Sequence, residues 1–536
     1  MATKNVAVGI SPNRSATPVQ RENTAGSKDK EKFAASVAAA GDGSEARPVN
    51  AIADSTRMPQ PLKLVAPRGV AHARAVTQPK TAHVPVIAPT GQIKDHKSWL
   101  FVNIMAADNN LTKYMLGNLD DQERVGSDLN THVVAYIDVG HEPNPMDHTW
   151  HGARSYYINK DDTPNEIKSE LIEDYGDDVD MSDPETLRVF IADAIRKYPA
   201  TNIALVLNDH GGGFTGAMAD DTDGGFMTTP QLARAIAGAE VDTGKKISIL
   251  IFDACLEGEA EVAYENRNNA EIMLASEETI NGPGLPYSAI LGRAIAEAIS
   301  RTQKALEQPD EAKINVGPRD FAKTVVDITR EHQNDLPTFA ALDLAEFDTL
   351  PPKINALAEA IKNASDQVSL RQKLYDQVAR LAAKIFQVVG PGTGESQANA
   401  REGVRQAIKE SENYGGGYTP YRDIRDLRDL CEHLKQSKDP KVKHAAVDLI
   451  AEVDSLVIAN ESSASKHPHS HGLSIYAPIL KSDKIGEGYD DLAFAKDTEW
   501  SKALLSLKTT GTPAEPGTPA RVWPDGSPKK DRPQAK

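Results

Sequence analysis

Between residues 97 and 300 of the chain, short apolar runs alternate with segments in which apolar residues recur every three or four positions. Continuous apolar runs of this length are typical of buried strands, whereas the wider spacing is typical of helices that cover a sheet. The alternation predicts an α/β fold with a doubly wound, mostly parallel sheet of about six strands flanked by helices. The predicted strands are 98–106, 132–139, 154–158, 271–275 and the apolar runs within 203–213 and 246–255, and the predicted helices are 112–125, 184–198, 229–237 and 287–298.

Beyond residue 300 the pattern becomes more helical, which predicts a helix-rich C-terminal extension. Helices are expected at 318–332, 343–361, 367–388, 421–434 and 442–459, with strands at 338–344 and 472–478. Both ends of the chain lack either periodicity and are rich in small and turn-forming residues, which predicts flexible tails. The predicted organisation is a disordered basic tail at 1–96, a catalytic core at 97–300, a helix-rich region at 301–507 and a second flexible tail at 508–536.

The charge of the chain is unevenly distributed. Of 536 residues 40% are hydrophobic, so the chain can bury a substantial core. The net charge is −17, but residues 1–97 carry 14 Lys or Arg against 7 Asp or Glu, which leaves −24 for the remainder. An acidic body argues against a nucleic-acid partner, because phosphate binding needs clustered positive charge. It suits basic polypeptide substrates, or it only keeps the protein in solution.

The sequence carries no membrane or export pattern and few cysteines. No apolar stretch reaches the roughly 18 to 20 residues of a spanning helix, and the N-terminus lacks the pattern of a secretory signal. We therefore expect no membrane partner and a cytoplasmic location, with export by another route left open. Cys255 and Cys431 are the only cysteines, so no disulfide framework exists and both are expected to be reduced thiols. Cys431 shares a predicted helix face with Ile424, Leu427 and Leu434, which indicates packing.

Two of the apolar runs lead directly into reactive side chains. One ends at His210, which Gly211, Gly212 and Gly213 follow, and the other ends at Cys255. His210 and Cys255 are separated by 45 positions, which leaves room for one crossover helix, so the two strands can be neighbours. Because chemistry in parallel sheets collects beyond the carboxyl ends of the strands, the two side chains are expected to lie close together. A thiol beside an imidazole is what a cysteine nucleophile and its base require.

An apolar block ending in His-Gly, followed by one ending in Asp-Ala-Cys, resembles the clostripain family of cysteine peptidases, which has the caspase-like fold. The segments 99–109 (WLFVNIMAADN), 275–278 (ASEE) and 472–478 (GLSIYAP) resemble the same family, and the likeness spans roughly residues 97–505. The resemblance implies a caspase-like fold, a Cys255 and His210 dyad, and cleavage of peptide bonds after Arg or Lys. It also implies that the backbone amides of Cys255 and Gly211 form the oxyanion hole.

The predicted dyad needs help to ionise, because an ordinary cysteine with a pKa of about 8.5 is mostly protonated at neutral pH. His210 is the predicted general base. The segment after Cys255 is predicted to be helical, and the dipole of its N-terminus would stabilise a thiolate. The alternatives are an inert buried cysteine and a histidine held in a glycine-rich loop for packing.

Asp253 is the predicted residue for substrate selection. It precedes Cys255 by two positions on one strand, so both side chains point to the same face. An unpaired carboxylate there disfavours the thiolate, and a docked basic side chain would relieve that repulsion through a charge-assisted pair. Glu277 and Glu278 are further candidates for substrate binding, with ordinary loop acids as the alternative.

The chemistry requires no metal or other cofactor, but two clusters could bind one. Three aspartates in the loop after His210 could coordinate calcium, although their spacing is not that of an EF-hand and an acidic turn is favoured. Three alternating histidines could bind zinc on an extended strand, although the proline and serines around them favour a solvated loop. The aspartates are Asp220, Asp221 and Asp223, and the histidines are His467, His469 and His471.

The sequence therefore predicts a cysteine endopeptidase that cleaves after Arg or Lys through a thioester acyl-enzyme. The alternatives are a catalytically inactive caspase-like binding module and, more remotely, a metallohydrolase that uses the histidine cluster. No Lys or Arg lies between Lys197 and Arg234, so the loop after His210 offers no basic cleavage site. We expect a zymogen that matures by cleavage in its basic N-terminal tail.

Overall fold

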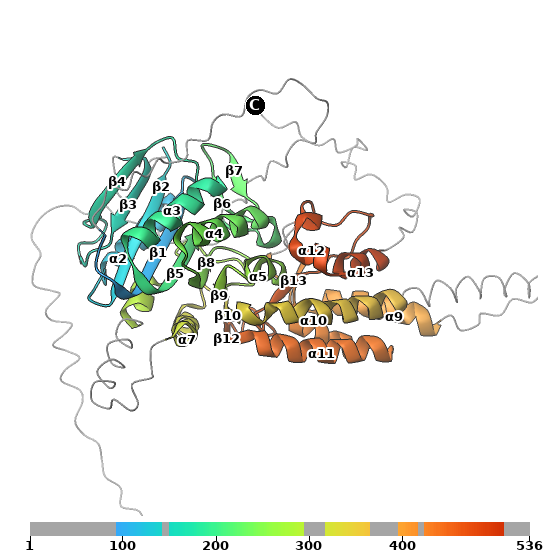
Figure 1. Ribbon diagram of the computed structural model, residues 1–536. Coiled ribbons are helices and arrows are strands. Elements are labelled where there is room, and N and C mark those ends of the chain that lie inside the picture. Colours follow the sequence, from blue (N-terminus) through green and yellow to red (C-terminus); the bar gives the residue numbers. More distant parts are fainter. Residues whose placement is uncertain (1–92, 142–149, 294–316, 365–394, 416–422, 509–536) are drawn as a thin grey trace, which may run out of the picture. The chain divides into compact units, whose positions relative to one another are not determined.

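The computed structural model describes residues 93–141, 150–293, 317–364, 395–415 and 423–508. Its centre is a nine-stranded sheet in the order β12-β10-β9-β8-β5-β1-β2-β3-β4 (Figure 1). The strands are β1 (Lys97–Ala107), β2 (Thr131–Val139), β3 (Gly152–Tyr157), β4 (Glu170–Gly176), β5 (Ala200–Asn208), β8 (Ile247–Asp253), β9 (Ala270–Ala275), β10 (Thr338–Asp343) and β12 (Val457–Ser462).

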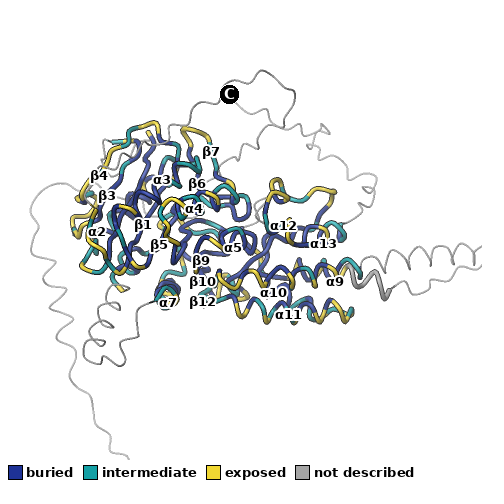
Figure 2. The backbone as a smooth tube through the Cα atoms, viewed as in Figure 1, coloured by how far each residue is buried: buried dark blue, intermediate teal, exposed yellow. Residues whose placement is uncertain are grey.

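The five middle strands of this sheet, from β9 to β2, are parallel to one another. The pairs at both edges, β2 with β3, β3 with β4, β9 with β10 and β10 with β12, are antiparallel. β2 and β8 are buried along their whole length, as expected for strands covered on both faces, whereas β4 at the edge is largely exposed (Figure 2).

Alternate residues of the middle strands enter two separate apolar cores. Leu100, Val102 and Ile104 of β1 belong to the core with α3 (Pro184–Lys197), α4 (Thr229–Thr243) and α5 (Ala260–Asn266). Phe101 and Met105 belong to the other core, with α2 (Thr112–Glu123) and α7 (Pro318–Thr329). The period of two along β1 thus sends successive side chains to opposite helical layers.

The C-terminal residues contribute helices to the first of these cores. α9 (Glu395–Glu410), α10 (Leu427–Leu434) and α11 (Pro440–Leu456) pack side by side (Figure 1). α12 (Ala493–Asp497) and α13 (Trp500–Ser506) follow, and Trp500 is buried. The short strands β11 (Ile424–Asp426) and β13 (Ser474–Tyr476) pair antiparallel, and β6 (Ala217–Asp220) and β7 (Gly225–Met227) form a hairpin.

The structure confirms the predicted mostly parallel sheet with helices in the C-terminal part, and it corrects several details. The sheet has nine strands instead of about six, because β4 and two strands from beyond residue 300 join it. The helix predicted at 442–459 ends at Leu456, and the chain continues as strand β12. The late strand predicted at 472–478 is the shorter β13. Within the described ranges, no helix combines the length and the apolar character needed to cross a membrane.

Three predicted segments fall outside the described residues. The predicted helix at 367–388 and the predicted C-terminal tail beyond residue 508 lie there, as does the basic tail up to residue 92. These expectations stay predictions.

Candidate active site

The two reactive side chains follow neighbouring parallel strands. β5 and β8 pair in parallel with Asn208 opposite Asp253, so His210 and Cys255 each lie two residues beyond a paired position. The crossover between them is α4, which begins with a capping box formed by Thr228 and Gln231. The predicted juxtaposition therefore arises from one βαβ unit.

The loops that carry His210 and Cys255 are in direct contact. A Cβ atom on Gly211 would lie 2.3 Å from the carbonyl oxygen of Cys255 and 2.9 Å from its nitrogen. Only a glycine permits this approach, because real Cβ atoms do not come so close to backbone atoms. The backbone next to His210 thus lies against the backbone of Cys255, where the predicted oxyanion donors would converge.

The Cys255 thiol lies in an unfavourable environment for ionisation. Its Sγ accepts a hydrogen bond from the Ile280 amide at 3.3 Å and donates to the Ile280 carbonyl at 3.6 Å. Burial raises the pKa of Cys255 to about 12, and the carboxylates of Glu278, Glu257 and Asp253 add to the rise. The predicted helix dipole is absent at this position, because α5 begins only at Ala260 and Leu256 adopts a left-handed conformation with φ 68°.

His210 is neutral and held by a residue that the sequence did not indicate. Its Nε2 lies 2.7 Å from Oδ1 of Asn110. Because an amide oxygen can only accept, Nε2 carries the proton and Nδ1 is left as the basic nitrogen. Burial lowers the pKa of His210 to about 4. Among the described residues, His210 and Cys255 are not hydrogen-bonded to each other in this state.

Asp209, the residue before His210, anchors the histidine loop through buried hydrogen bonds. Asp209 is buried and accepts hydrogen bonds from the side chain of Asn109, at 2.8 Å, and from the amide of Ala219. Asn109 also donates to the Ala106 carbonyl at 2.9 Å, at the end of β1. The segment 106–110 therefore positions the histidine loop through two successive asparagines.

Asp253 is buried beneath the loop that follows β9. Its Oδ2 accepts hydrogen bonds from the Tyr287 hydroxyl at 2.7 Å and the Leu285 amide at 3.1 Å. A Cβ atom on Gly284 would lie 2.6 to 2.7 Å from the two carboxylate oxygens. Burial raises the pKa of Asp253 to about 6, although both hydrogen bonds oppose the rise. No cationic side chain of the described residues forms an ion pair with it.

The family model of the clostripain family, Peptidase_C11, matches residues 103–507. The chain belongs to the clostripain family. It is 27% identical to clostripain of Hathewaya histolytica over 222 residues, which are 35% of this chain and 40% of that protein. The match thus spans less than half the length of this relative.

A solved structure of a C11 protease has the same fold. An inactive zymogen C11 protease from Parabacteroides distasonis superposes with a TM-score of 0.50 at 20% identity, covering 76% of this chain and 99% of that one. A secreted C11 cysteine protease from Bacteroides thetaiotaomicron, in complex with an irreversible peptide inhibitor, gives 0.49 at 17% identity over the same shares. The family model confirms the predicted family, and the superposition on the zymogen supports the predicted fold class.

Glu277 and Glu278, the further candidates for substrate binding in this clostripain-family chain, contact the C-terminal region. Glu277 is buried and accepts from the Gly472 amide at 2.9 Å. Glu278 accepts from the Thr279 and Gly415 amides at 2.7 and 3.0 Å, and it lies 3.5 Å from His467. Both carboxylates thus bind protein groups, and they join the loop after β9 to later parts of the chain.

The three alternating histidines are separated by their partners. His467 lies between Glu278 and Glu412, at 3.5 and 3.3 Å, whereas His471 contacts Asp426 at 3.1 Å. The hydrogen bond and charge of Asp426 outweigh burial and raise the pKa of His471. Where the structure describes the chain, these histidines are not among the groups that could share a metal ion. In the described part of the chain the three histidines therefore do not converge on one point.

The acidic loop takes part in two carboxylate clusters at the carboxyl edge of the sheet. Asp220 groups with Asp108 and Asp138, and also with Asp180 and Asp223, with ligand oxygens within 4.8 Å of one another. Burial raises the pKa of Asp220 to about 6, and that of Asp138 rises well above its usual range. Such oxygen-only donor sets suit calcium. Asp221 of the predicted set belongs to neither cluster, and the added carboxylates are Asp108 directly after β1, Asp138 in β2 and Asp180.

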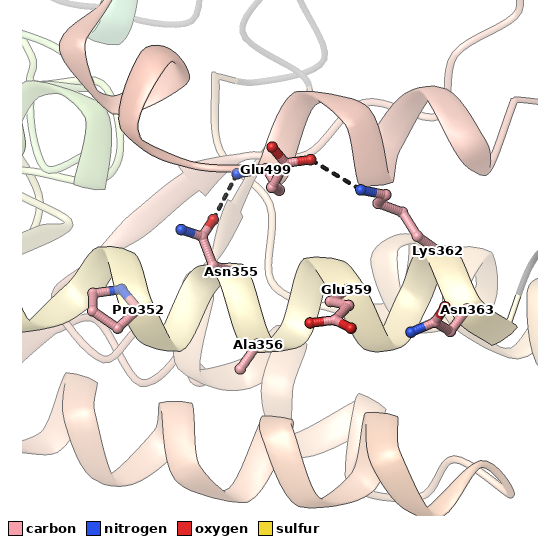
Figure 3. Close-up of a pocket in the computed structure, with 7 residues that line it drawn as sticks. All are labelled: Pro352, Asn355, Ala356, Glu359, Lys362, Asn363 and Glu499. Carbon is pink, nitrogen blue, oxygen red and sulfur yellow. Dashed lines mark hydrogen bonds and ion pairs between the residues drawn. The ribbon is translucent and has the colours of Figure 1, made fainter.

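A groove of about 590 Å³ lies away from the dyad, along the helix at residues 350–364. Figure 3 shows Glu499 bridging this helix to the start of α13, with Asn355 and Lys362 pointing toward it. Five of the seven lining residues are polar or charged, and neither His210 nor Cys255 is among the seven. This groove is therefore not the catalytic site.

Proposed function

We propose that this chain is a cysteine endopeptidase that cleaves peptide bonds after Arg or Lys, with Cys255 as nucleophile and His210 as base. The observation that carries the proposal is the contact between Gly211 and Cys255 at the ends of two neighbouring parallel strands. The contact brings the Cys255 segment and the loop that carries His210 together at one edge of the sheet, which supports a thiol and an imidazole acting at one site. Membership of the clostripain family supports the same chemistry.

The proposed reaction proceeds in two halves. His210 Nδ1 takes the thiol proton as Sγ attacks the peptide carbonyl, and the amides of Gly211 and Cys255 stabilise the oxyanion. Collapse breaks the C–N bond, and the imidazolium gives its proton to the leaving amine, which leaves a thioester. Water, deprotonated by His210, then attacks the thioester and releases the acid and the thiol.

The pKa values of Cys255 and His210 fit a site in which the bound substrate promotes ionisation of the thiol. With the Cys255 pKa near 12 and the His210 pKa near 4, the unoccupied site holds a thiol and a neutral imidazole. Asp253 is 4% exposed, so a substrate side chain can reach it only if the loop at Gly284 and Leu285 moves aside. A basic side chain that then pairs with Asp253 would neutralise one of the carboxylates that disfavour the thiolate. The same ion pair would therefore hold the substrate and favour ionisation of the Cys255 thiol. Asp253 is the residue that we assign to substrate selection.

We propose a structural role for a calcium ion at Asp108, Asp138 and Asp220. The charges of Asp220 and Asp108 help to raise the pKa of buried Asp138, so a divalent cation would relieve their mutual repulsion. The calcium ion would take no part in the proposed reaction of Cys255 and His210.

The decisive experiment uses an arginyl fluorogenic peptide with wild type, Cys255→Ala and Cys431→Ala. We expect Cys255→Ala to abolish turnover and Cys431→Ala, a change in the buried face of α10, to retain it. A thiol alkylator should stop wild-type turnover, and a metallohydrolase would instead respond to a chelator. A wild-type protein that binds the peptide without cleaving it would favour the alternative, an inactive binding module.

A further inference from the structure

Two buried glutamates follow the nucleophile, and the proposed reaction does not use them. Glu257 and Glu259 are 1% and 0% exposed. They lie between Cys255 and α5, on the segment that contacts the loop after His210. Buried carboxylates are costly to desolvate, so each is expected to bind specific donors.

The donors are successive backbone amides of the histidine loop. Oε1 of Glu257 accepts from the amides of Gly212 and Gly213, both at 3.1 Å. Oε2 of Glu259 accepts from the next amide, that of Phe214, at 2.8 Å. The nucleophile segment therefore holds the histidine loop through side-chain oxygens.

Glu257 is also the carboxylate that meets Gly211. A Cβ atom on Gly211 would lie 2.7 Å from Oε1 of Glu257, besides its contacts with the Cys255 backbone. The orientation of the Gly211 peptide is thus set on one side by Cys255 and on the other by the Glu257 oxygen that binds the two following amides. Moving that oxygen would release the loop beside the proposed oxyanion site.

We infer that Glu257 is a positioning residue, which fixes the Gly211 to Gly213 backbone against Cys255 and thereby aligns the oxyanion hole. The inference deepens the proposed function and rests on it. An acceptor oxygen is the required feature, since the contacts are hydrogen bonds from neutral amides. Burial raises the pKa of Glu257 well above its usual range, so a protonated carboxyl can fill the same role through its carbonyl oxygen.

The test compares variants of Glu257 with a matched control. Glu257→Gln keeps an acceptor oxygen, and Glu257→Leu removes it. The control is Glu123, a buried glutamate at the end of α2 whose Oε1 also accepts two successive amides, those of Lys168 and Ser169 at 2.9 and 2.6 Å. Glu123→Leu should lower the melting temperature in the same way without touching the dyad.

Three measurements separate positioning from general structural support. With an arginyl peptide, Glu257→Leu should lower kcat by about 100-fold, the effect of losing an oxyanion donor, with little change in KM. Affinity for an arginyl peptide aldehyde, whose thiol adduct carries the oxyanion, should fall by a similar factor. Alkylation of Cys255 by iodoacetamide, which forms no oxyanion, should keep its wild-type rate, and Glu257→Gln should retain most activity.

Two other results would contradict the positioning role of Glu257. Equal losses of kcat in Glu257→Leu and Glu123→Leu, or alkylation that falls in step with kcat, would overturn the positioning role. Where Glu257→Leu does not fold, Glu257→Asp, which withdraws the acceptor by one methylene, should give the same pattern at a smaller scale. A wild-type protein without turnover would contradict the proposed peptidase function instead.

Discussion

Replacing Asp253 by Asn should make the protein more stable at neutral pH and less active on basic substrates. The carboxylate is buried, with 4% of the residue exposed, and receives two neutral hydrogen bonds, one from the Tyr287 hydroxyl and one from the Leu285 amide. The amide oxygen of Asn can accept the same two bonds. The substitution therefore removes a buried charge while the shape and the acceptor are kept.

The magnitude follows from the pKa of Asp253, which burial raises from 3.8 to about 6. Below pH 3.8 the carboxyl is protonated in both the folded and the unfolded chain. Between pH 3.8 and 6 the unfolded chain loses this proton and the folded chain keeps it, so the free energy of unfolding falls as pH rises. One pKa unit corresponds to about 1.4 kcal/mol, so the loss is about 3 kcal/mol above pH 6. The Asp253→Asn variant carries no titratable group at this position and should not show this loss of stability.

The assay is urea unfolding followed by tryptophan fluorescence between pH 4 and pH 8, in a Cys255→Ala background that prevents self-cleavage. The two proteins should have similar free energies of unfolding at pH 4, and the Asn variant should gain up to about 3 kcal/mol by pH 7. In the active background, the loss of a charge-assisted pair should lower kcat/KM for arginyl peptides by about 10- to 100-fold. A stability difference that does not change with pH would refute the reasoning.

Three further outcomes are expected. Asn110→Ala removes the acceptor that sets the His210 tautomer, and steady-state kinetics should show kcat reduced by about 10- to 100-fold; an unchanged kcat would mean that another group orients the ring. Calcium should raise the melting temperature of wild type but not of Asp138→Asn, and EDTA should reverse the gain; equal shifts in both proteins would place the ion elsewhere. Wild type, but not Cys255→Ala, should lose part of residues 1–96 on incubation, as read by N-terminal sequencing. A cut between His210 and Cys255 would contradict this prediction.

The sequence by itself determined the centre of the sheet and the neighbouring positions of His210 and Cys255, the residues of the proposed dyad. Strands β1, β5 and β8 are mostly apolar runs, which is the pattern of strands that are buried on both faces of a sheet. The capped helix α4 between His210 and Cys255 then leaves a right-handed crossover as the natural connection. Adjacent strand ends follow from these local features.

Only the tertiary structure decided which polar side chains surround the proposed dyad. Strand β12 pairs with β10 across more than 110 residues of sequence, and no local period encodes such a pairing. Glu277 binds the Gly472 amide, Glu257 binds the histidine loop and Asn110 binds His210, so each contact depends on how distant segments meet. A carboxylate in a sequence looks the same whether it faces solvent or a buried amide. Its environment, and with it its pKa and its role, is a property of the folded chain.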